Sequence, residues 1–278
     1  LSRGTAACTS AEVDRRIAQG RAADGRDDRE ADSPAARASA VIGTAVVVLL
    51  LAVYTMSNPG RDNFYNHFVW QAAAWLDGEA SIPYPVYETD GLPHANWYFQ
   101  DVLEIRDAGG DLTGRALIPF PPLPALVILP FVALWGLATD AQLIATILGA
   151  LDVGLAFWLI GRLTVRPAVR LATSIFFGLG TVFWYTSMLG TTWYLAHVVA
   201  VGLTLLALGV ALGADRDAVE DAADLLAPGI AAVDEGADYE ELPDVPIPAG
   251  FWPLDGRQFL AGFLLGLAAT ARLPMIFG

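Results

Sequence analysis

The chain has 278 residues, of which 55% are hydrophobic, and its formal net charge is −14. This composition is too apolar for an ordinary soluble domain. All 16 basic residues are arginine, and the acidic excess argues against nucleic-acid binding, which needs basic patches. The single cysteine, Cys8, excludes a disulfide framework and a thiolate metal site.

Residues 1–37 combine many arginines and acids with Ala, Gly and Ser, and they lack the apolar side chains of a core. We therefore expect a disordered tail. The apolar run 38–56 follows directly. Because a helix rises 1.5 Å per residue, this run just crosses a hydrocarbon layer about 30 Å thick. It is the first predicted transmembrane helix.

A polar segment, Ser57 to Pro122, follows the first helix and combines carboxylates, histidines, aromatic rings and amides. We expect any chemistry to lie here. The next apolar run, 119–137, opens with several prolines and has Pro130 in its middle. The later apolar runs are predicted transmembrane helices and comprise residues 141–163, 169–189, 192–212 and 259–277.

Arginine placement predicts which runs cross the membrane. Arg162, Arg166 and Arg170 occupy a short connection without acids, and such connections lie in the cytoplasm. The arginine-rich tail belongs on the same side. The first helix takes the chain to the outer side at Ser57, so only one crossing can lie between Ser57 and Arg162. The run 141–163 supplies that crossing, and the run 119–137 should lie at the outer interface. A true span there would instead place the three arginines outside.

The fold class expected from this pattern is an all-α polytopic membrane protein with its N-terminus in the cytoplasm, most simply of the plasma membrane. Its parts are a tail (1–37), four transmembrane helices with a large outer loop at 57–140 (38–213), an acidic cytoplasmic loop (214–257) and a fifth helix (258–278). The acidic loop is rich in proline, and we expect disorder there. Because the chain stops within an apolar run, we expect it to be part of a longer protein.

The predicted topology places all three histidines, His67, His94 and His197, on or near the outer side, together with most tryptophans. Tryptophan prefers the membrane interface without any function, although Trp70 is also suited to stacking on a sugar. Three histidines could hold a metal, but their spacing matches no ligand pattern. A divalent cation is therefore left open.

Three charged residues are candidates for chemistry. Asp62 lies just beyond the first helix, where a carboxylate can point between helices or into solvent. Arg272 lies within an apolar run, where a cation has a partner or a role, so it either snorkels or binds an anionic lipid head group. Asp152 lies within a predicted span, and we expect it to be protonated or hydrogen-bonded between helices.

The order of these features resembles the GT-C superfamily of membrane glycosyltransferases, especially the protein O-mannosyltransferase type of family 39. Asp62 corresponds by position to the family's catalytic acid. Pro121-Pro122-Leu123 resembles its Lys-Pro-Pro-Leu element, with Phe120 in place of the lysine. Residues 262–274 resemble a Gly-Leu-Ala-rich helix that ends in a basic residue, here Arg272. The family's second acid, which follows its third span, has no counterpart in this sequence. The mannosyltransferases also carry an Asp-Glu pair, whereas Asp62 is followed by Asn63.

The resemblance implies interfacial helices in the first outer loop and a polyprenyl-phosphate sugar as the donor. Asp62 would be the general base on an acceptor hydroxyl of a protein, lipid or glycan. Arg272 would offset charge on the leaving phosphate. His197, His67, Trp70 and Tyr98 would line the sugar site.

Two other classes stay open. A transporter or lipid flippase subunit would use Arg272 and Asp152 as coupling charges. Transporters concentrate polar residues on broken helices at the bilayer centre, whereas this sequence concentrates them in the outer loop. A noncatalytic scaffold of the same fold would leave Asp62 facing solvent.

Overall fold

A computed structural model describes residues 33–60, 66–84, 101–163, 165–234 and 256–272, with the backbone alone for 214–234. The chain forms two compact units, residues 1–46 and 47–278, and the account below concerns the second. Several predicted features lie outside the described residues: most of the N-terminal tail, Asp62, His94, Tyr98 and the acidic stretch 235–255.

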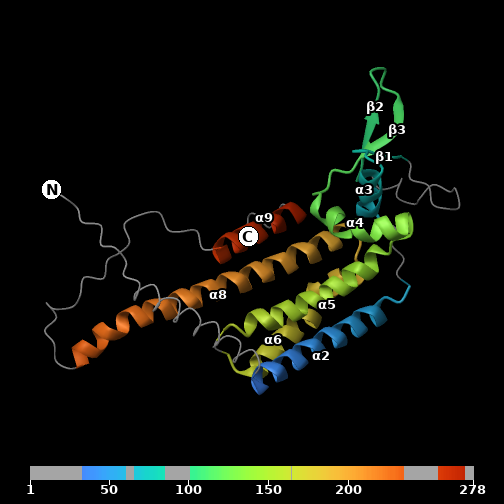
Figure 1. Cartoon of the computed structure of the whole chain (residues 1–278). Coiled ribbons are helices and arrows are strands. Elements are labelled where there is room, and N and C mark those ends of the chain that lie inside the picture. Colours follow the sequence, from blue (N-terminus) through green and yellow to red (C-terminus); the bar gives the residue numbers. More distant parts are fainter. Residues whose placement is uncertain (1–32, 61–65, 85–100, 164, 235–255, 273–278) are drawn as a thin grey trace, which may run out of the picture. The chain divides into compact units, whose positions relative to one another are not determined.

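Three helices are long and apolar enough to cross a membrane: α2 (Pro34–Ser57), α5 (Ala141–Ile160) and the first 22 residues of α8 (Thr192–Asp234). A fourth crossing is formed if α6 (Pro167–Leu179) and α7 (Val182–Leu189) act together. The chain is thus mostly helical and has the apolar helices of a membrane protein (Figure 1).

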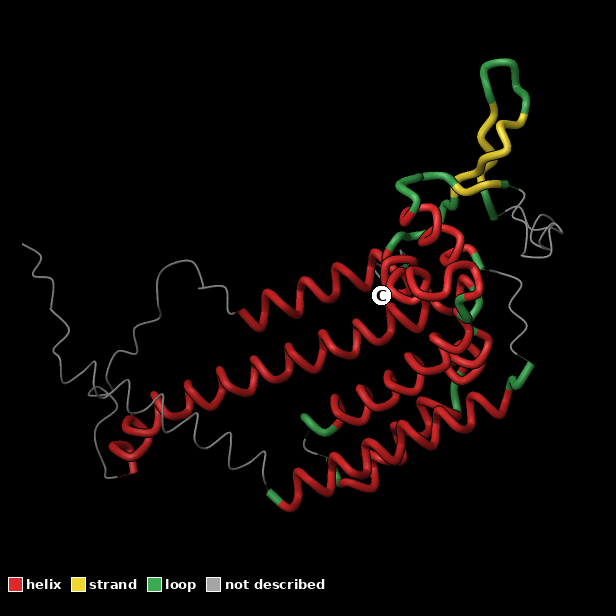
Figure 2. The backbone as a smooth tube through the Cα atoms, turned by 45° about the vertical axis from the view of Figure 1, so that its right-hand side comes forward, coloured by secondary structure: helices red, strands yellow, loops and turns green. Residues whose placement is uncertain are grey.

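Helices α5 and α8 run parallel. The start of α5, at Ile144, shares a hydrophobic core with Leu195 at the start of α8. Further along, the Trp158 ring of α5 lies against Gly209 of α8. The intervening pair α6–α7 must therefore return in the opposite direction. Figure 2 shows the long helices lying side by side.

The other two helices run antiparallel to their neighbours. At the end of α2, Asn58 Nδ2 donates to the Met188 carbonyl (3.4 Å), which also accepts from Gln142 Nε2 at the start of α5 (2.7 Å). At the end of α9 (Gly256–Ala271), Arg272 Nη1 donates to the Trp193 carbonyl at the start of α8 (3.0 Å). Leaving out α3 and α4, the helices α2, α5, α6–α7, α8 and α9 thus alternate in direction, which is compatible with the predicted topology.

Glycines of α8 let side chains of α5 approach its backbone closely. A Cβ atom at Gly202 would overlap Asp152 Oδ1, one at Gly209 would overlap the Trp158 ring, and one at Gly213 would overlap the Arg162 guanidinium. Spacings of seven and four residues place the three glycines on one face of α8. Gly202 and Gly209 each leave a gap that a side chain of α5 fills, and the gap at Gly213 is filled by Arg162, two residues beyond the end of α5.

The expected single helix 169–189 is broken between α6 and α7, which meet at an angle of 56°. Gly180 ends α6, and the Thr181 side chain accepts a hydrogen bond from Phe183 N (3.1 Å) and so caps α7. A glycine that ends one helix followed by a threonine that starts the next is a local signal for such a break.

Two helix boundaries differ from the sequence prediction. The predicted cytoplasmic loop begins at residue 214, but α8 continues as a helix to Asp234. Acidic residues and alanine are compatible with helix, so charge alone does not end it. The predicted fifth span is described only as the 16 residues of α9, which is about 24 Å of helix and less than a bilayer core. Five spans are therefore not established.

A three-stranded antiparallel sheet corrects the all-helical prediction; it lies in residues 57–140, called the outer loop after its predicted side. Its strands are β1 (Ile82–Pro83), β2 (Leu103–Arg106) and β3 (Leu112–Leu117), in the order β1-β3-β2. The β2–β3 turn is fixed by Asp107 Oδ1, which accepts from the amides of Gly109 (2.8 Å) and Asp111 (3.0 Å). Gly110 supplies the positive φ of 90° that this turn requires.

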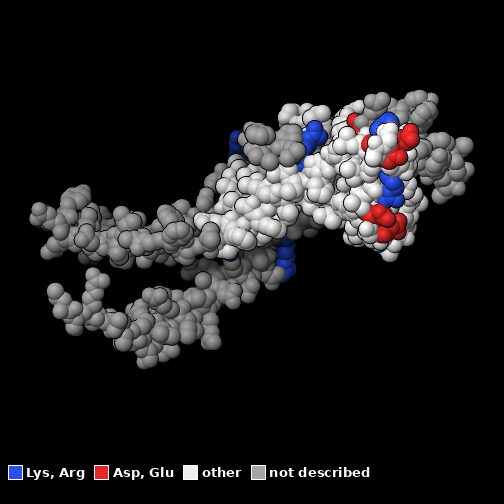
Figure 3. Space-filling model, turned by 90° about the horizontal axis from the view of Figure 1, so that it is seen from above, with Lys and Arg blue, Asp and Glu red and all other residues white. Residues whose placement is uncertain are grey.

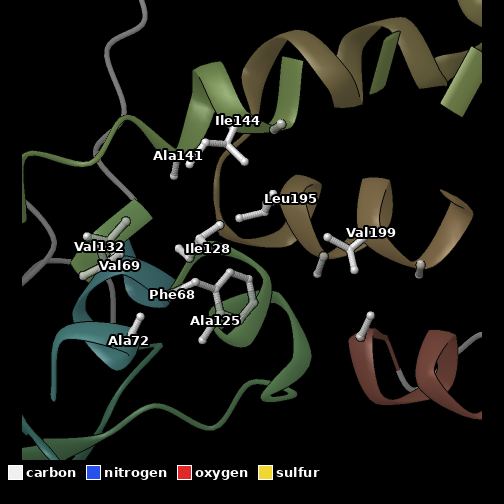
Figure 4. Close-up of a cluster of buried hydrophobic side chains, with 14 residues drawn as sticks. Phe68, Val69, Ala72, Ala125, Ile128, Val132, Ala141, Ile144, Leu195 and Val199 are labelled. Carbon is white, nitrogen blue, oxygen red and sulfur yellow. The ribbon is translucent and has the colours of Figure 1, made fainter. Parts of the chain in front are cut away.

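The outer loop also contains two helices, α3 (His67–Leu76) and α4 (Leu123–Trp135). Phe68 and Val69 of α3 and Ile128 of α4 are buried in one core with the starts of α5 and α8 (Figure 4). The 13 residues of α4 give about 20 Å of helix, which is too short to cross a bilayer. This length favours the predicted interfacial position of the run 119–137.

The surface of the helices supports burial in lipid. Large apolar side chains stand exposed along them, among them Val182 (75%), Phe176 (64%) and Phe259 (64%). In Figure 3 the acidic side chains gather at the end that carries the small sheet, whereas some arginines also lie along the helices. A surface this apolar is stable only against lipid or another apolar partner.

Cysteine labelling tests the predicted sidedness. In a Cys8→Ser background, Asp111→Cys in the β2–β3 turn should react with an impermeant thiol reagent in intact cells, whereas Arg166→Cys should react only after permeabilisation. The reason is that an odd number of crossings separates the two positions in the predicted topology. Reaction of both from outside would overturn it.

Candidate functional site

His67 is the innermost polar residue of the outer-loop helices. It begins α3 and is completely buried. Its Nδ1 atom is 2.8 Å from Thr192 Oγ1 at the start of α8. This contact ties the outer loop to the end of the helical bundle.

Aromatic rings surround His67. The ring centroids of Trp70 and Phe120 lie 5.1 and 5.3 Å from the imidazole, and that of Trp193 lies at 6.5 Å. Phe120 also meets Trp193 edge to face, at 6.4 Å. Edge-to-face rings of this kind hold one another in fixed orientations. Three separate chain segments therefore meet here.

Arg272 brings a cation to this group of rings. Its guanidinium is half-buried and donates to the Trp193 carbonyl, which fixes it beside the first turn of α8. The half-buried His197 lies one turn after Trp193, on the same face of α8. We call His67, Trp70, Phe120, Trp193, His197 and Arg272 the aromatic–cation cluster.

The cluster gathers four of the six predicted site residues. His67, Trp70, His197 and Arg272 belong to it, although they come from segments separated by up to 205 residues (67 to 272). Asp62 and Tyr98 lie outside the described residues. The described flanks of the Asp62 segment are Asn58, bonded to Met188 O, and His67, bonded to Thr192. Both flanks are therefore attached to the turn between α7 and α8.

Three members of this environment were not singled out from the sequence. Trp193 was counted only among the tryptophans expected at the membrane interface, and Phe120 was noted only as a departure from a family motif. Thr192 was not considered. The four-residue spacing of Trp193 and His197 does place them on one helix face, which is a usable signal. The contact of Phe120 with His67 depends on the fold of the whole outer loop.

The described residues give no indication of a metal centre. Among residues 33–60, 66–84, 101–163, 165–213 and 256–272, no three His, Cys, Asp or Glu side chains are grouped closely enough to hold an ion. His67 is instead engaged by Thr192 and by aromatic rings. His94 and Asp62 lie outside the described residues, so the question of a cation there stays a prediction.

The arrangement suits an anionic group next to a planar or cyclic one. A guanidinium offers a fork of donors that matches phosphate oxygens, and no carboxylate of the described residues pairs with Arg272. Indole and phenyl faces suit the apolar faces of sugar rings. The chain matches no protein-family model, no curated protein and no solved structure in comparisons with each.

Proposed function

We propose that the protein is a membrane glycosyltransferase that moves a sugar from a polyprenyl-phosphate donor to an acceptor hydroxyl. The aromatic–cation cluster is the proposed binding site for the donor's phosphate and sugar. The observation that carries the proposal is the half-buried Arg272 guanidinium at one end of an apolar bundle. It is held by the backbone carbonyl of Trp193, whose ring packs on that of Phe120.

The cation is the first support. One N–H of Arg272 donates to the Trp193 carbonyl, and its other N–H groups can donate to phosphate oxygens. As the bond between the sugar and the phosphate breaks, negative charge grows on the leaving polyprenyl phosphate. A fixed guanidinium stabilises that charge more than it stabilises the ground state.

The apolar surroundings are the second support. A polyprenyl chain needs a lipid-like surface next to the phosphate site. Helix α4, which packs on the same core, exposes Leu126, Leu134 and Trp135. The donor would therefore keep its tail in the membrane and its head group at the cluster.

Asp62 is the proposed general base. It would accept the proton of the acceptor hydroxyl while the hydroxyl oxygen bonds the anomeric carbon. Asp62 follows Asn58 by four positions in the sequence, just beyond the end of α2. The acceptor is a protein, lipid or glycan hydroxyl on the outer side of the plasma membrane.

A multi-pass transporter or lipid flippase subunit is the second candidate. Two observations favour it: Asp152 is buried within a possible span, and α6–α7 is broken beside Tyr54, whose hydroxyl donates to the Gly178 carbonyl (2.8 Å). Broken helices near buried polar groups are typical of transporter sites.

One experiment separates the two candidates. The full-length protein in nanodiscs is incubated with radiolabelled polyprenyl-phosphate hexoses and pentoses and a membrane extract as the acceptor source. Transfer of label to acceptor supports the glycosyltransferase. Proteoliposomes that show ion flux or lipid movement without any transfer would support the transporter and overturn the proposal.

A further inference from the structure

Three arginines lie at the end of the bundle opposite to the aromatic–cation cluster, and the proposed transfer reaction uses none of them. They are Arg162, Arg166 and Arg170, on the connection from α5 to α6. The start of α5 shares a hydrophobic core with Phe120 of the cluster, and the 20 residues of α5 put its other end about 30 Å away. This end of the bundle is therefore a separate surface.

Two of the three guanidinium groups are held in place by α5. Arg170 Nε donates to the Phe157 carbonyl (2.6 Å), and the Arg170 guanidinium lies 3.7 Å from the centroid of the Phe157 ring. The Arg162 guanidinium lies over the Trp158 ring, at 4.5 Å from its centroid. Stacking on an aromatic ring fixes the plane of a guanidinium while the group keeps its charge. Both cations are therefore prearranged.

The three arginines are neighbours in space as well as in sequence. The Arg170 guanidinium packs so closely on Gly161, the residue before Arg162, that a Cβ atom there would overlap it. Arg166 is exposed and stands directly before α6. Its carbonyl accepts from Arg170 N (3.1 Å), so the two residues are one turn apart. Like charges at this spacing repel each other, and an anion bound beside them offsets the repulsion.

The connection has no counter-charge of its own, because the sequence has no acid between Asp152 and Asp215. Asp152 is buried inside the bundle. Asp215 belongs to α8, two positions beyond Gly213, where the Arg162 guanidinium packs. The acidic part of α8 therefore begins beside Arg162, and its side chains, which lie outside those described, are the alternative anions.

Exposed apolar side chains border the arginines. Leu163 (46% exposed), Val165 (39%) and Val169 (42%) belong to the same short stretch of chain. A water-soluble anion gains nothing from such a border. A phospholipid matches both parts of the surface, with its phosphate at the arginines and its acyl chains against the leucine and valines. Basic groups at the ends of transmembrane helices are suited to anionic head groups for this reason.

We propose that Arg162, Arg166 and Arg170 form a binding site for the head group of an anionic phospholipid. The exposed Arg166 contacts the lipid phosphate, and the two ring-stacked guanidiniums supply fixed positive charge beside it. In the predicted topology this lipid belongs to the inner leaflet. The proposal does not depend on the glycosyltransferase assignment, because the site lies at the other end of the bundle.

Native mass spectrometry of the detergent-solubilised protein measures the binding. From an equal mixture of phosphatidylglycerol and phosphatidylcholine, the protein should retain phosphatidylglycerol preferentially. Arg166→Ala should weaken this binding by about fivefold, the usual effect of one basic residue near an anionic membrane surface. Arg166→Lys keeps the charge and should bind more tightly than Arg166→Ala.

Arg106→Ala is the matched control, because it also removes one exposed arginine, but from the small sheet. It should bind phosphatidylglycerol like the wild type. Equal binding of the two lipids by the wild type, or equal losses in Arg166→Ala and Arg106→Ala, overturns the proposal.

Two further measurements identify the place and the source of the anion. In nanodiscs, a phosphatidylglycerol analogue with a photoreactive head group should label residues 162–170 rather than the outer loop. Glycerol phosphate, which lacks acyl chains, should not displace the lipid at equal concentration. Labelling confined to the outer loop, or such displacement, contradicts a lipid site. If phosphatidylglycerol bound only after Asp215→Asn and Asp217→Asn, the acids of α8 rather than a lipid would neutralise the arginines, which also overturns the proposal.

Discussion

Replacing Asp62 by asparagine should reduce transfer from the polyprenyl-phosphate sugar by about 10²–10⁴-fold, the contribution usual for general base catalysis. Asparagine keeps the size and polarity of the side chain but cannot accept the acceptor's proton. The expected change is in kcat, with little change in KM, since the base acts in the reaction rather than in donor binding. Transfer assays with saturating donor measure this change.

The matched control is Asp111→Asn, which removes a carboxylate from the β2–β3 turn of the same outer loop. It should leave the rate of transfer unchanged. Equal amounts of monodisperse protein after size-exclusion chromatography exclude a folding defect. Wild-type turnover in Asp62→Asn would remove the main reason to regard the protein as an enzyme, and the transporter candidate would then gain support.

Arg272→Ala should reduce the rate of transfer by about 10²–10³-fold. This is the usual effect of losing a fixed hydrogen-bond donor to a charge that develops in the transition state. Arg272→Lys should be milder, because the charge stays while the bidentate fork is lost. Measured kcat values of the three proteins should therefore fall in the order Arg, Lys, Ala.

Arg257→Ala is the matched control for this series. Arg257 lies on the same helix, α9, but at its opposite end and in an exposed position. Its loss should leave transfer close to the wild-type rate. If Arg257→Ala and Arg272→Ala were equally impaired, the effect would reflect insertion of α9 into the membrane rather than binding of a phosphate.

Apolar runs predicted the helices well because burial in lipid needs only length and hydrophobicity. The runs at 38–56 and 141–163 correspond to α2 and α5. The outer-loop sheet was missed, since its strands are short and largely exposed and show no clear alternation. Its turn, Asp107 to Asp111, was the usable signal. The continuation of α8 was missed because the density of proline and acidic residues in 214–257 was taken as a sign of disorder.

Four of the residues named from the sequence lie together in the structure, but the sequence did not show how they meet. His67, His197 and Arg272 stood out as polar side chains next to or within apolar runs, and Trp70 as an aromatic ring suited to stacking on a sugar. The contact of His67 with Thr192 joins residues 125 positions apart, and no local pattern encodes it. The place of Phe120 between two rings likewise follows from how the outer loop packs.

The gaps at three glycines of α8 have a mechanical consequence. Sliding α8 along α5 by a single residue, about 1.5 Å, would drive backbone into the side chains that fill Gly202, Gly209 and Gly213. The two helices are thus locked against sliding and should move together as one rigid body. Any opening that admits a lipid-linked donor must then come from the parts attached to its end, such as α3, α4 or α9, rather than from shear within the pair.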